Sequence, residues 1–169
     1  MTDSLIRAAT AEDFPALRAI EHAAFETLRR AGAVSGPAAV SGDADLRRYL
    51  EADCLDLAMD AAGQPIGYVG ASLLQGWLHV GELDVHPAWQ RQGIGRRLMK
   101  GILDKGRSSG LPGATLTTDR LAAFNAPFYA SLGFRPVDDA SLPWLQAILD
   151  AEVAKGLDPA RRLAMRLDF

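Results

Sequence analysis

Apolar residues recur with a helical period in two segments near the N-terminus. In the first segment, the apolar positions after Thr10 are Phe14, Leu17, Ile20, Ala24, Phe25 and Leu28. A spacing of three or four residues is typical of an amphipathic α-helix. Thr10, with Asp13 three residues later, suits the N-terminal cap of this helix. The same spacing predicts a second helix over 43–53.

Short strand-like segments, separated by Gly and Pro, fill much of the chain before residue 87. We expect strands at Leu5–Ala9, Leu55–Asp60, Pro65–Leu74 and Trp77–His86. Helices and strands then alternate: helix 95–108, strand 114–118, helix 126–132, strand 134–137, helix 141–155 and strand 162–169. Closely spaced strands favour antiparallel pairing, whereas helix 95–108 allows one parallel crossover. The order predicts one α/β (α+β) domain over 1–169, with helices flanking a mixed, mostly antiparallel sheet of about six or seven strands.

The amino-acid composition excludes several classes of function but does not identify the function. The 169 residues are 49% hydrophobic, which is enough for a single core. A net charge of -3 disfavours a broad nucleic-acid-binding face, because such a face needs clustered Lys and Arg. The single cysteine, Cys54, excludes a disulfide framework and a multi-cysteine zinc site. No signal-peptide pattern or bilayer-length apolar run is visible, so we expect a cytoplasmic protein without a membrane, nucleic-acid or metal partner.

The segment 83–97 (LDVHPAWQRQGIGRR) places a glycine-rich turn between a strand and a helix. Gly93 and Gly95 open the helix, whose first-turn N–H groups and positive dipole end suit an anion such as pyrophosphate. Nearby arginines add positive charge: Arg91, Arg96 and Arg97. The alternative is an ordinary tight turn with solvated arginines. A P-loop would need GK[ST], and a dinucleotide fingerprint would need a small residue where Leu98 stands, so neither nucleotide site is supported.

Two separated motifs resemble those of a known family. Residues 90–95 (QRQGIG) match the pattern Q/R-x-x-G-x-G/A after a strand that ends LDVHP. Further along, 125–134 (NAPFYASLGF) contain Asn, then Phe-Tyr, then Gly-Phe. The chain is therefore similar, over its whole element order, to the GNAT superfamily of N-acetyltransferases. The resemblance implies an enzyme that binds acetyl-CoA as cosubstrate, without a metal. It would transfer the acetyl group to a primary amine of a small molecule or protein by direct attack in a ternary complex.

The resemblance also implies which residues bind coenzyme A. The amides that wrap the pyrophosphate belong to Gln90, Arg91, Gln92, Gly93, Ile94, Gly95 and Arg96. The pantetheine arm pairs, as an added β-strand would, with Leu83, Asp84 and Val85. The Val85 N–H would polarise the thioester carbonyl. Asn125 would hydrogen-bond the arm through its side-chain amide, and Phe128 belongs to the same binding set.

Attack by an amine on a thioester requires a base for the ammonium and benefits from an acid for the leaving thiolate. The resemblance assigns the acid to Tyr129, which would otherwise be a packing aromatic. His79 and Glu82, on the strand before the glycine-rich turn, are rival bases, with Glu82 acting directly or through a water. Strict alternation would place them on opposite faces of the sheet. A bulge at Gly81 would bring both toward one side.

The acceptor is left open by the sequence. The family builds its acceptor pocket from the first two helices and nearby loops, here about residues 25–49, which carry no readable motif. Segment 31–42 is interpreted as a connecting loop, with a flap over the substrate as the alternative. Asp84 and Asp119 are weaker candidates that could attract a cationic amine. Rival functions are an acyl-CoA-binding sensor or scaffold without turnover and an acyltransferase with another acyl group or acceptor; a homodimer is compatible with either.

Overall fold

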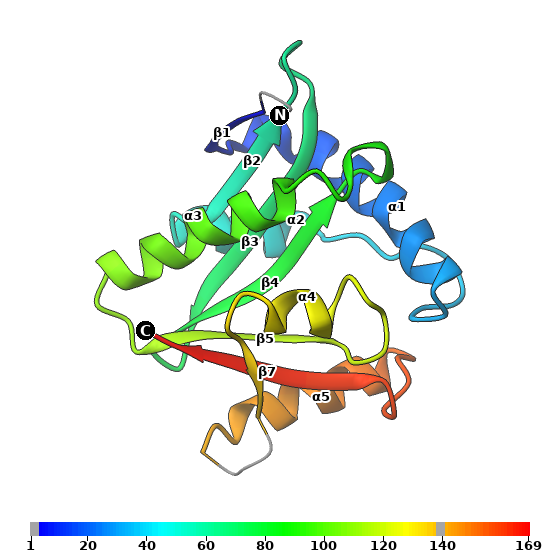
Figure 1. Cartoon of the computed structure of the whole chain (residues 1–169), viewed down its shortest axis with the longest axis vertical. Helices are drawn as coiled ribbons and strands as arrows, with labels where there is room; N and C mark the ends of the chain where they lie inside the picture. The colour runs from blue at the N-terminus through cyan, green and yellow to red at the C-terminus, as the bar shows by residue number, and fades with distance from the viewer. Residues whose placement is uncertain (1–3, 138–140) are drawn as a thin grey trace.

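The fold is described by a computed structural model that covers residues 4–137 and 141–169. Within these residues, seven strands form one sheet in the order β1-β2-β3-β4-β5-β7-β6 (Figure 1). The strands are β1 (Leu5–Ala8), β2 (Leu55–Met59), β3 (Pro65–Leu74), β4 (Trp77–Val85), β5 (Gly113–Asp119), β6 (Arg135–Pro136) and β7 (Arg162–Asp168). In this sheet β4 and β5 are parallel and the other neighbours are antiparallel. The mixed, mostly antiparallel sheet confirms the predicted fold class.

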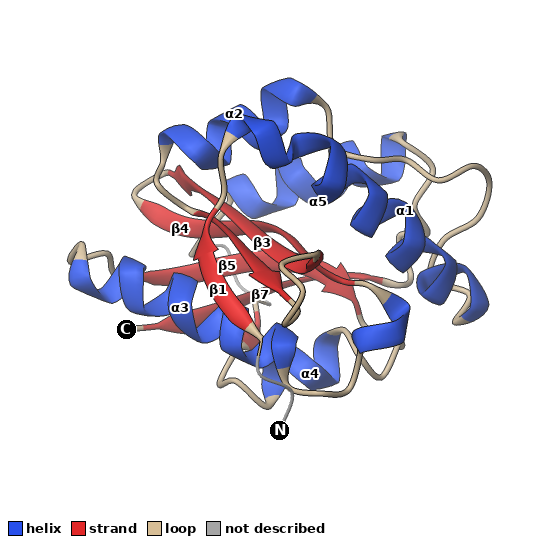
Figure 2. Cartoon of the chain, turned by 90° about the horizontal axis from the view of Figure 1, so that it is seen from above, coloured by secondary structure: helices blue, strands red, loops and turns tan. Residues whose placement is uncertain are grey.

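Helices cover both faces of the sheet. They are α1 (Phe14–Arg30), α2 (Asp43–Glu51), α3 (Ile94–Ser108), α4 (Ala126–Ala130) and α5 (Trp144–Ala154). Figure 2 shows α1, α2 and α5 on one face and α3 with α4 on the other. None of the helices in the described part of the chain has the length and apolar character needed to traverse a bilayer.

Each face of the sheet has its own hydrophobic core. On one face, α3 buries Leu98, Met99 and Ile102, which recur at helical spacing, against the sheet. On the other face, α1 buries residues such as Leu17 beside Tyr68 of β3. Burying a side chain of this size stabilises a fold by roughly 1.5–3 kcal/mol. The two cores therefore hold the helices firmly against the strands that carry the candidate site.

The parallel strands β4 and β5 separate soon after they meet. Their pairing is limited to Leu78 with Ala114 and His79 with Thr115. Figure 1 shows the two strands diverging from this point toward the C-terminal end of β4. The edge of β4 after His79 therefore lacks a neighbouring strand on its β5 side, and its backbone N–H and C=O groups can pair with a ligand.

The predicted bulge at Gly81 is present. Gly70 of β3 pairs with Glu82, and the next residue of β3, Ala71, pairs with Val80, so Gly81 is the extra residue on β4. Beyond the bulge, the side chains of Leu83 and Val85 pack in the same core as Leu78 and Val80. Because strand residues alternate between faces on each side of the bulge, His79, Glu82 and Asp84 share the opposite face.

The differences from the predicted bounds in the C-terminal part of the chain occur at proline and glycine residues. Strand 134–137 is reduced to Arg135–Pro136, since Pro136 has no N–H to donate to a ladder. The last helix begins at Trp144, directly after Pro143, rather than at residue 141. Helix 126–132 ends at Ala130, before Gly133, whose left-handed φ of 98° turns the chain away.

Candidate active site

The turn between β4 and α3 has the backbone geometry of an anion-binding loop. Arg91 and Gly93 both have left-handed φ angles, 60° and 81°, and such residues turn neighbouring N–H groups toward a common point. Gly93 caps α3, and its carbonyl accepts the first helical bond, from the Arg97 N–H, at 3.0 Å. The N–H groups of 94–96 therefore precede the helical ladder. The turn presents these donors and the positive end of the helix dipole to solvent.

The arginines near this turn have different partners. Arg96 donates to Ser131 Oγ at 2.8 Å, and its guanidinium lies 5.9 Å from the centre of the Phe128 ring. Arg97 donates to the side chain and carbonyl of Ser4 at 2.5 and 2.6 Å. The expectation that Arg97 adds charge to the anion site is therefore corrected: it fastens the N-terminal segment to α3. Arg91 is exposed at the turn itself.

The free edge of β4 begins where β5 leaves it. The His86 N–H donates to the Ile66 carbonyl of the β3 side at 2.9 Å. Successive backbone groups of a strand point to alternate sides, so those of Val85 and Leu83 point toward the opening beside β5. The Gln90 side-chain amide already donates to the Val85 carbonyl at 2.9 Å. The backbone groups that remain available on this edge are the Val85 N–H and the N–H and C=O of Leu83. The side chains of both residues pack against the core.

Helix α4 brings the second motif to this opening. Asn125 precedes the helix, and its carbonyl accepts the Tyr129 N–H at 3.0 Å. Its side chain makes no capping hydrogen bond, so the amide can bind another partner. Phe128 packs against the core beside Leu83 and Val85 and meets the Tyr129 ring edge-on, with ring centres 5.2 Å apart.

The Tyr129 ring is held on two sides by aromatic rings. It meets both Phe128 and Phe134 edge-on, with the Phe134 ring centre 6.0 Å away. Burial, with smaller contributions from the charges of Asp84 and Glu82, raises the pKa of the Tyr129 hydroxyl. At neutral pH this hydroxyl is protonated and can donate a hydrogen bond or a proton.

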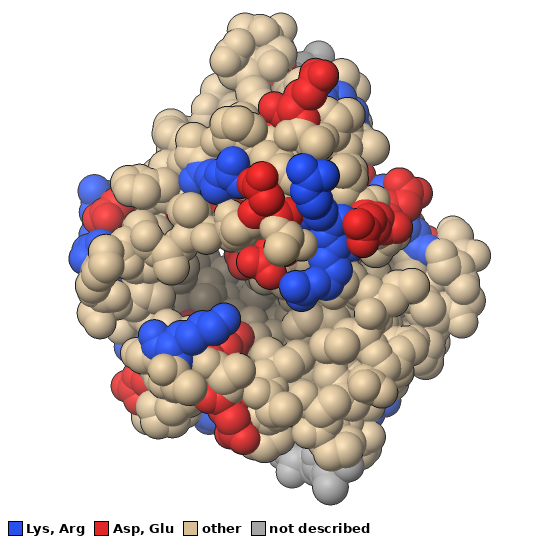
Figure 3. Space-filling view, turned by 180° about the vertical axis from the view of Figure 1, so that it is seen from behind, with Lys and Arg blue, Asp and Glu red and all other residues tan. Residues whose placement is uncertain are grey.

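On the opposite face of the sheet, a cavity of about 350 Å³ opens between α1, α2 and β4. Its lining residues are Glu21, Phe25, Leu28, Ala39, Val40, Ser41, Asp45, Tyr49, Glu82, Asp84 and Lys155. Figure 3 shows this side of the molecule, with a central hollow bordered by both acidic and basic side chains. Segment 31–42 has no helix or strand, as expected of a loop, and its last residues also form part of the cavity wall.

Two carboxyl groups two residues apart lie on the β4 side of this cavity. Burial, followed by the charges of Asp84, Glu21 and Asp45, raises the pKa of Glu82 well above its ordinary value. Burial and the charge of Glu21 raise the pKa of Asp84 to about 7, although a hydrogen bond with Glu82 opposes this. Asp84 was expected among the coenzyme A residues, but its side chain lines the cavity on the other face from Leu83 and Val85.

The acidic cavity is braced by a buried network around Glu21. The Tyr68 hydroxyl donates to one carboxylate oxygen of Glu21, and the Ser41 N–H donates to the other at 2.6 Å. Glu21 is 6% exposed and Tyr68 is fully buried. These bonds satisfy the carboxylate and tie the loop before α2 to α1, which fixes one wall of the cavity.

His79 shares the face of Glu82 but is not among the residues that line the cavity. Its Nδ1 lies 3.0 Å from the Thr115 hydroxyl, and its ring meets Trp144 of α5 edge-on at 6.0 Å. Burial lowers the pKa of His79 to about 4, and the nearby charge of Glu152 only partly opposes this. The imidazole is therefore neutral at pH 7 and is covered by α5.

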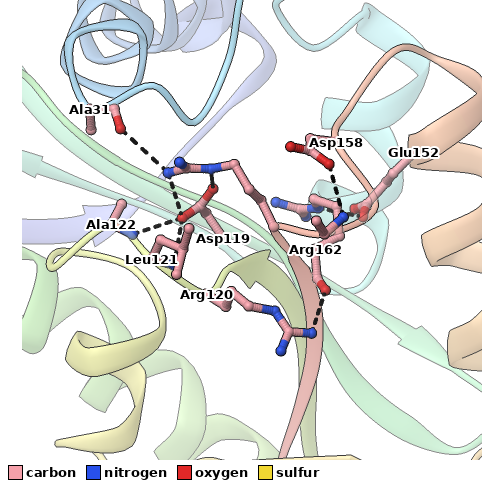
Figure 4. Close-up of polar contacts among 10 residues, drawn as sticks. Ala31, Asp119, Arg120, Leu121, Ala122, Glu152, Asp158 and Arg162 are labelled. Carbon is pink, nitrogen blue, oxygen red and sulfur yellow. Dashed lines mark hydrogen bonds and ion pairs between the residues drawn. The ribbon is translucent and has the colours of Figure 1, made fainter.

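Asp119, at the end of β5, is fully engaged by other groups (Figure 4). Arg161 contacts its two carboxylate oxygens at 2.6 and 3.1 Å and also donates to the Ala31 carbonyl at 3.4 Å. The N–H groups of Leu121 and Ala122 donate to Asp119 at 2.8 and 2.7 Å. Asp119 is 2% exposed, so the expectation that it attracts an amine is corrected. Its network joins the loop after α1 to the ends of β5 and β7.

Most of the cavity wall comes from segment 25–49, where the acceptor pocket was expected, but Glu21 and Lys155 lie outside it and Tyr49 was not singled out within it. Glu21 and Tyr49 occupy positions of amphipathic helices that face the sheet. A helical pattern predicts that such positions are buried, but it does not distinguish core packing from a cavity wall. The one available signal was Glu21 itself, because a carboxylate on the buried face of a helix must have a partner. Within the described residues, no group of three His, Cys, Asp or Glu side chains could hold a metal ion.

Comparison with known proteins agrees with this geometry. The profile of the acetyltransferase (GNAT) family matches residues 16–134. The fold resembles the PaiA N-acetyltransferase of Thermoplasma acidophilum in complex with coenzyme A, with a TM-score of 0.71, 15% identity and coverage of 99% of this chain and 100% of that one. It also resembles the ribosomal-protein-S18-alanine N-acetyltransferase of Escherichia coli, with a TM-score of 0.69, 19% identity and coverage of 98% and 93%.

A third similar structure is Arabidopsis thaliana Naa50 in complex with the bisubstrate analogue CoA-Ac-MVNAL. Its TM-score is 0.70 at 15% identity, over 98% of this chain and 99% of that one. At these identities the three structures support the fold alone. The family profile, which spans more than half of the chain, confirms the resemblance read from the two motifs. The chain belongs to the acetyltransferase (GNAT) family.

Proposed function

We propose that this protein transfers the acetyl group of acetyl-CoA to a primary amine, which attacks the thioester directly in a ternary complex. The main support is the open edge of β4, which lies between the anion-binding turn on one side and the acidic cavity on the other. Two substrates could reach the same strand from opposite faces. Membership of the family supports acyl transfer, and the similar PaiA structure contains coenzyme A.

The residues around the turn fit coenzyme A by their chemistry. The N–H groups of 92–96, beside the exposed Arg91, would bind the pyrophosphate. The free backbone groups of Leu83 and the Val85 N–H would pair with the amides of the pantetheine arm. The Asn125 amide would add a side-chain hydrogen bond to this arm. These contacts would deliver the thioester to the β4 edge near Tyr129.

The cavity side would supply the amine and remove its proton. The raised pKa of Glu82 makes its carboxylate a stronger base than an exposed glutamate, so it can accept a proton from the ammonium directly or through water. The amine nitrogen then bonds to the acetyl carbon while the C–S bond breaks. Tyr129 donates a proton to the departing thiolate, and the proton that the nitrogen loses in forming the amide restores the Tyr129 hydroxyl through solvent.

We expect Tyr129→Phe to lower kcat about tenfold and to leave the Kd for coenzyme A nearly unchanged. The expected effect is modest because a thiol has a pKa of about 8.5, so much of the thiolate can leave without an acid. Steady-state release of free coenzyme A and calorimetric binding measure the two quantities. A variant with undiminished turnover would remove Tyr129 from the mechanism.

We expect His79→Gln to retain kcat within about threefold, because His79 is not the proposed base. Loss of a general acid or base would lower kcat far more. The imidazole contacts Thr115 and Trp144 rather than the cavity. The same release assay, with the melting temperature as a check on folding, tests this. A loss of kcat above tenfold in a folded variant that still binds coenzyme A would assign the base to His79.

The proposed function itself is tested by mixing the protein with acetyl-CoA and a panel of primary amines. Release of coenzyme A that depends on the amine, with the acetylated amine identified by mass spectrometry, is the expected result. A sensor or scaffold of the same fold would bind coenzyme A and release none with any amine. A protein that prefers a longer acyl-CoA or a hydroxyl acceptor would instead reveal itself in parallel assays with those substrates.

A further inference from the structure

Tyr49 is a polar side chain of the acidic cavity without a hydrogen-bonding role in the fold. It is 7% exposed and therefore more than nine-tenths buried, and it lines the cavity. Within the described residues, no hydrogen bond to the Tyr49 hydroxyl is present. Every fully buried side-chain nitrogen or oxygen of these residues has a hydrogen-bond partner, so the unbonded Tyr49 oxygen is not fully buried. The hydroxyl therefore has access to the cavity space.

The sequence makes room for this tyrosine at two glycines. The Tyr49 ring lies against Gly70 of β3, and its hydroxyl lies against Gly81 in the bulge of β4, so that a Cβ at either position would overlap it. A phenylalanine would fill the same space and keep the packing of the ring. The hydroxyl adds a hydrogen-bonding group at the bulge, beside Glu82. Burial is the main cause that raises the pKa of Tyr49, and the charge of Glu82 is the second.

The charges of the cavity are unbalanced. Among the residues that the structure describes, four carboxyl groups line it, from Glu21, Asp45, Glu82 and Asp84, against the one ammonium of Lys155. Asp45 is partly paired with Arg48 at 3.2 Å outside the cavity, and the oxygens of Glu21 accept from Tyr68 and Ser41. Acidic groups therefore outnumber basic groups in this lining, both on β4 and on the helices above it.

We propose, on the basis of the proposed function, that the acceptor is an aliphatic amine that carries a second positive charge and no carboxylate, and that the Tyr49 hydroxyl binds its reacting nitrogen. A carboxylate on the acceptor would meet the four acidic side chains and be repelled. One ammonium alone gives up its charge when it transfers its proton to Glu82. A second ammonium keeps its charge through the reaction and offsets the remaining carboxylates. The apolar stretch between the charges would lie along Phe25, Leu28 and Val40.

The raised pKa values agree with this assignment. Burial first, and then the charges of neighbouring carboxylates, hold the pKa of Glu82 and of Asp84 above their ordinary values. A bound dication would relieve this repulsion and lower both pKa values. Ligand binding should then release protons, and the heat of binding should depend on the ionisation enthalpy of the buffer.

Three acceptors of equal chain length test the charge requirement: putrescine, n-butylamine and γ-aminobutyrate. They carry a second ammonium, a methyl group and a carboxylate, respectively, at the far end. We expect kcat/KM to fall at least about tenfold from putrescine to n-butylamine and further to γ-aminobutyrate, since one charged hydrogen bond or ion pair is commonly worth a factor of this size. Equal or better use of γ-aminobutyrate would overturn the inference.

Tyr49→Phe tests the role of the hydroxyl. We expect KM for putrescine to rise about fivefold to tenfold, kcat at saturation to stay within about threefold, and the Kd for coenzyme A to be unchanged. Glu51→Gln, an exposed change on the same helix, is the control and should leave all three values as they are. An unchanged KM in Tyr49→Phe would remove the hydroxyl from the binding site.

Calorimetric titration of putrescine into the protein saturated with coenzyme A separates this inference from the proposed function. Binding of putrescine without acetyl transfer to any amine would reject the proposed function and retain the cation site. Acetyl transfer without a preference for putrescine, or without its binding, would retain the function and reject the cation site.

Discussion

Glu82→Gln is expected to lower kcat by at least about 100-fold, the loss typical of removing a general base. Glutamine has nearly the same shape and can still donate and accept hydrogen bonds, but it cannot accept a proton from the ammonium. It also removes a charge from a buried acidic group, so the variant should fold at least as well as the wild type. Pre-steady-state and steady-state release of coenzyme A, measured with saturating acetyl-CoA and amine, give kcat directly.

The control for this variant is Glu51→Gln, which makes the same chemical change at an exposed position of α2. It should retain wild-type kcat. The Kd for coenzyme A should be unchanged in both variants, because the carboxylate lies on the cavity side of the sheet, away from the turn at 90–96. Retention of kcat within threefold in Glu82→Gln would contradict the assignment of the base.

The same assignment fixes the direction of the pH dependence. A base must be ionised, and the pKa of Glu82 is raised, so kcat/KM should rise with pH at values well above the ordinary range of a glutamate. The charges of Asp84, Glu21 and Asp45 contribute to the raised pKa of Glu82. Tyr49 and Lys155 also line the cavity, and Tyr129 lies close enough for the charge of Glu82 to act on its hydroxyl. In Glu82→Gln this ascending limb should disappear, and only the limb from ionisation of the free amine should remain. An identical profile in both proteins would assign the limb to another group.

The sequence predicted the helices and strands well, because these depend on local pattern, and the residues proposed to bind coenzyme A also lie in short motifs. The alternation on β4, the glycines of the turn and the motif at 125–134 each lie within one short stretch of chain. Even the bulge could be anticipated from Gly81, since glycine in a strand often marks an irregular pairing. The consequence, that His79 and Glu82 share a face, follows from that one extra residue.

The acidic cavity could not be predicted residue by residue in the same way, because it is assembled from distant segments. Glu21, Tyr49 and Glu82 come from α1, α2 and β4, and each fits an ordinary pattern within its own element. His79 is a residue that the sequence pointed to but that does not line the cavity. It lies on the expected face of β4, but its ring is covered by α5, more than sixty positions later in the sequence. Only tertiary packing distinguishes a residue that lines a cavity from one covered by a helix.

Gly93→Val is expected to weaken coenzyme A binding about 30-fold or more. Gly93 has a φ of 81°, a conformation that costs an ordinary residue about 1–2 kcal/mol and a β-branched residue more. A Cβ at this position would meet nothing within 4 Å, so the effect would be conformational rather than a clash. The turn would relax toward negative φ and its N–H groups would no longer converge on the pyrophosphate. Calorimetric titration with coenzyme A, and with pantetheine for comparison, measures the loss of affinity.

Gly63→Val is a matched control, because Gly63 has a φ of 79° and equally open surroundings but lies in the turn between β2 and β3. Both variants should lose a similar amount of stability in urea, while only Gly93→Val loses affinity for coenzyme A. The affinity for pantetheine, which lacks the pyrophosphate, should change little in either protein. If Gly93→Val binds coenzyme A as tightly as Gly63→Val does, the pyrophosphate must bind elsewhere, and the orientation of the thioester on the β4 edge must be reassigned with it.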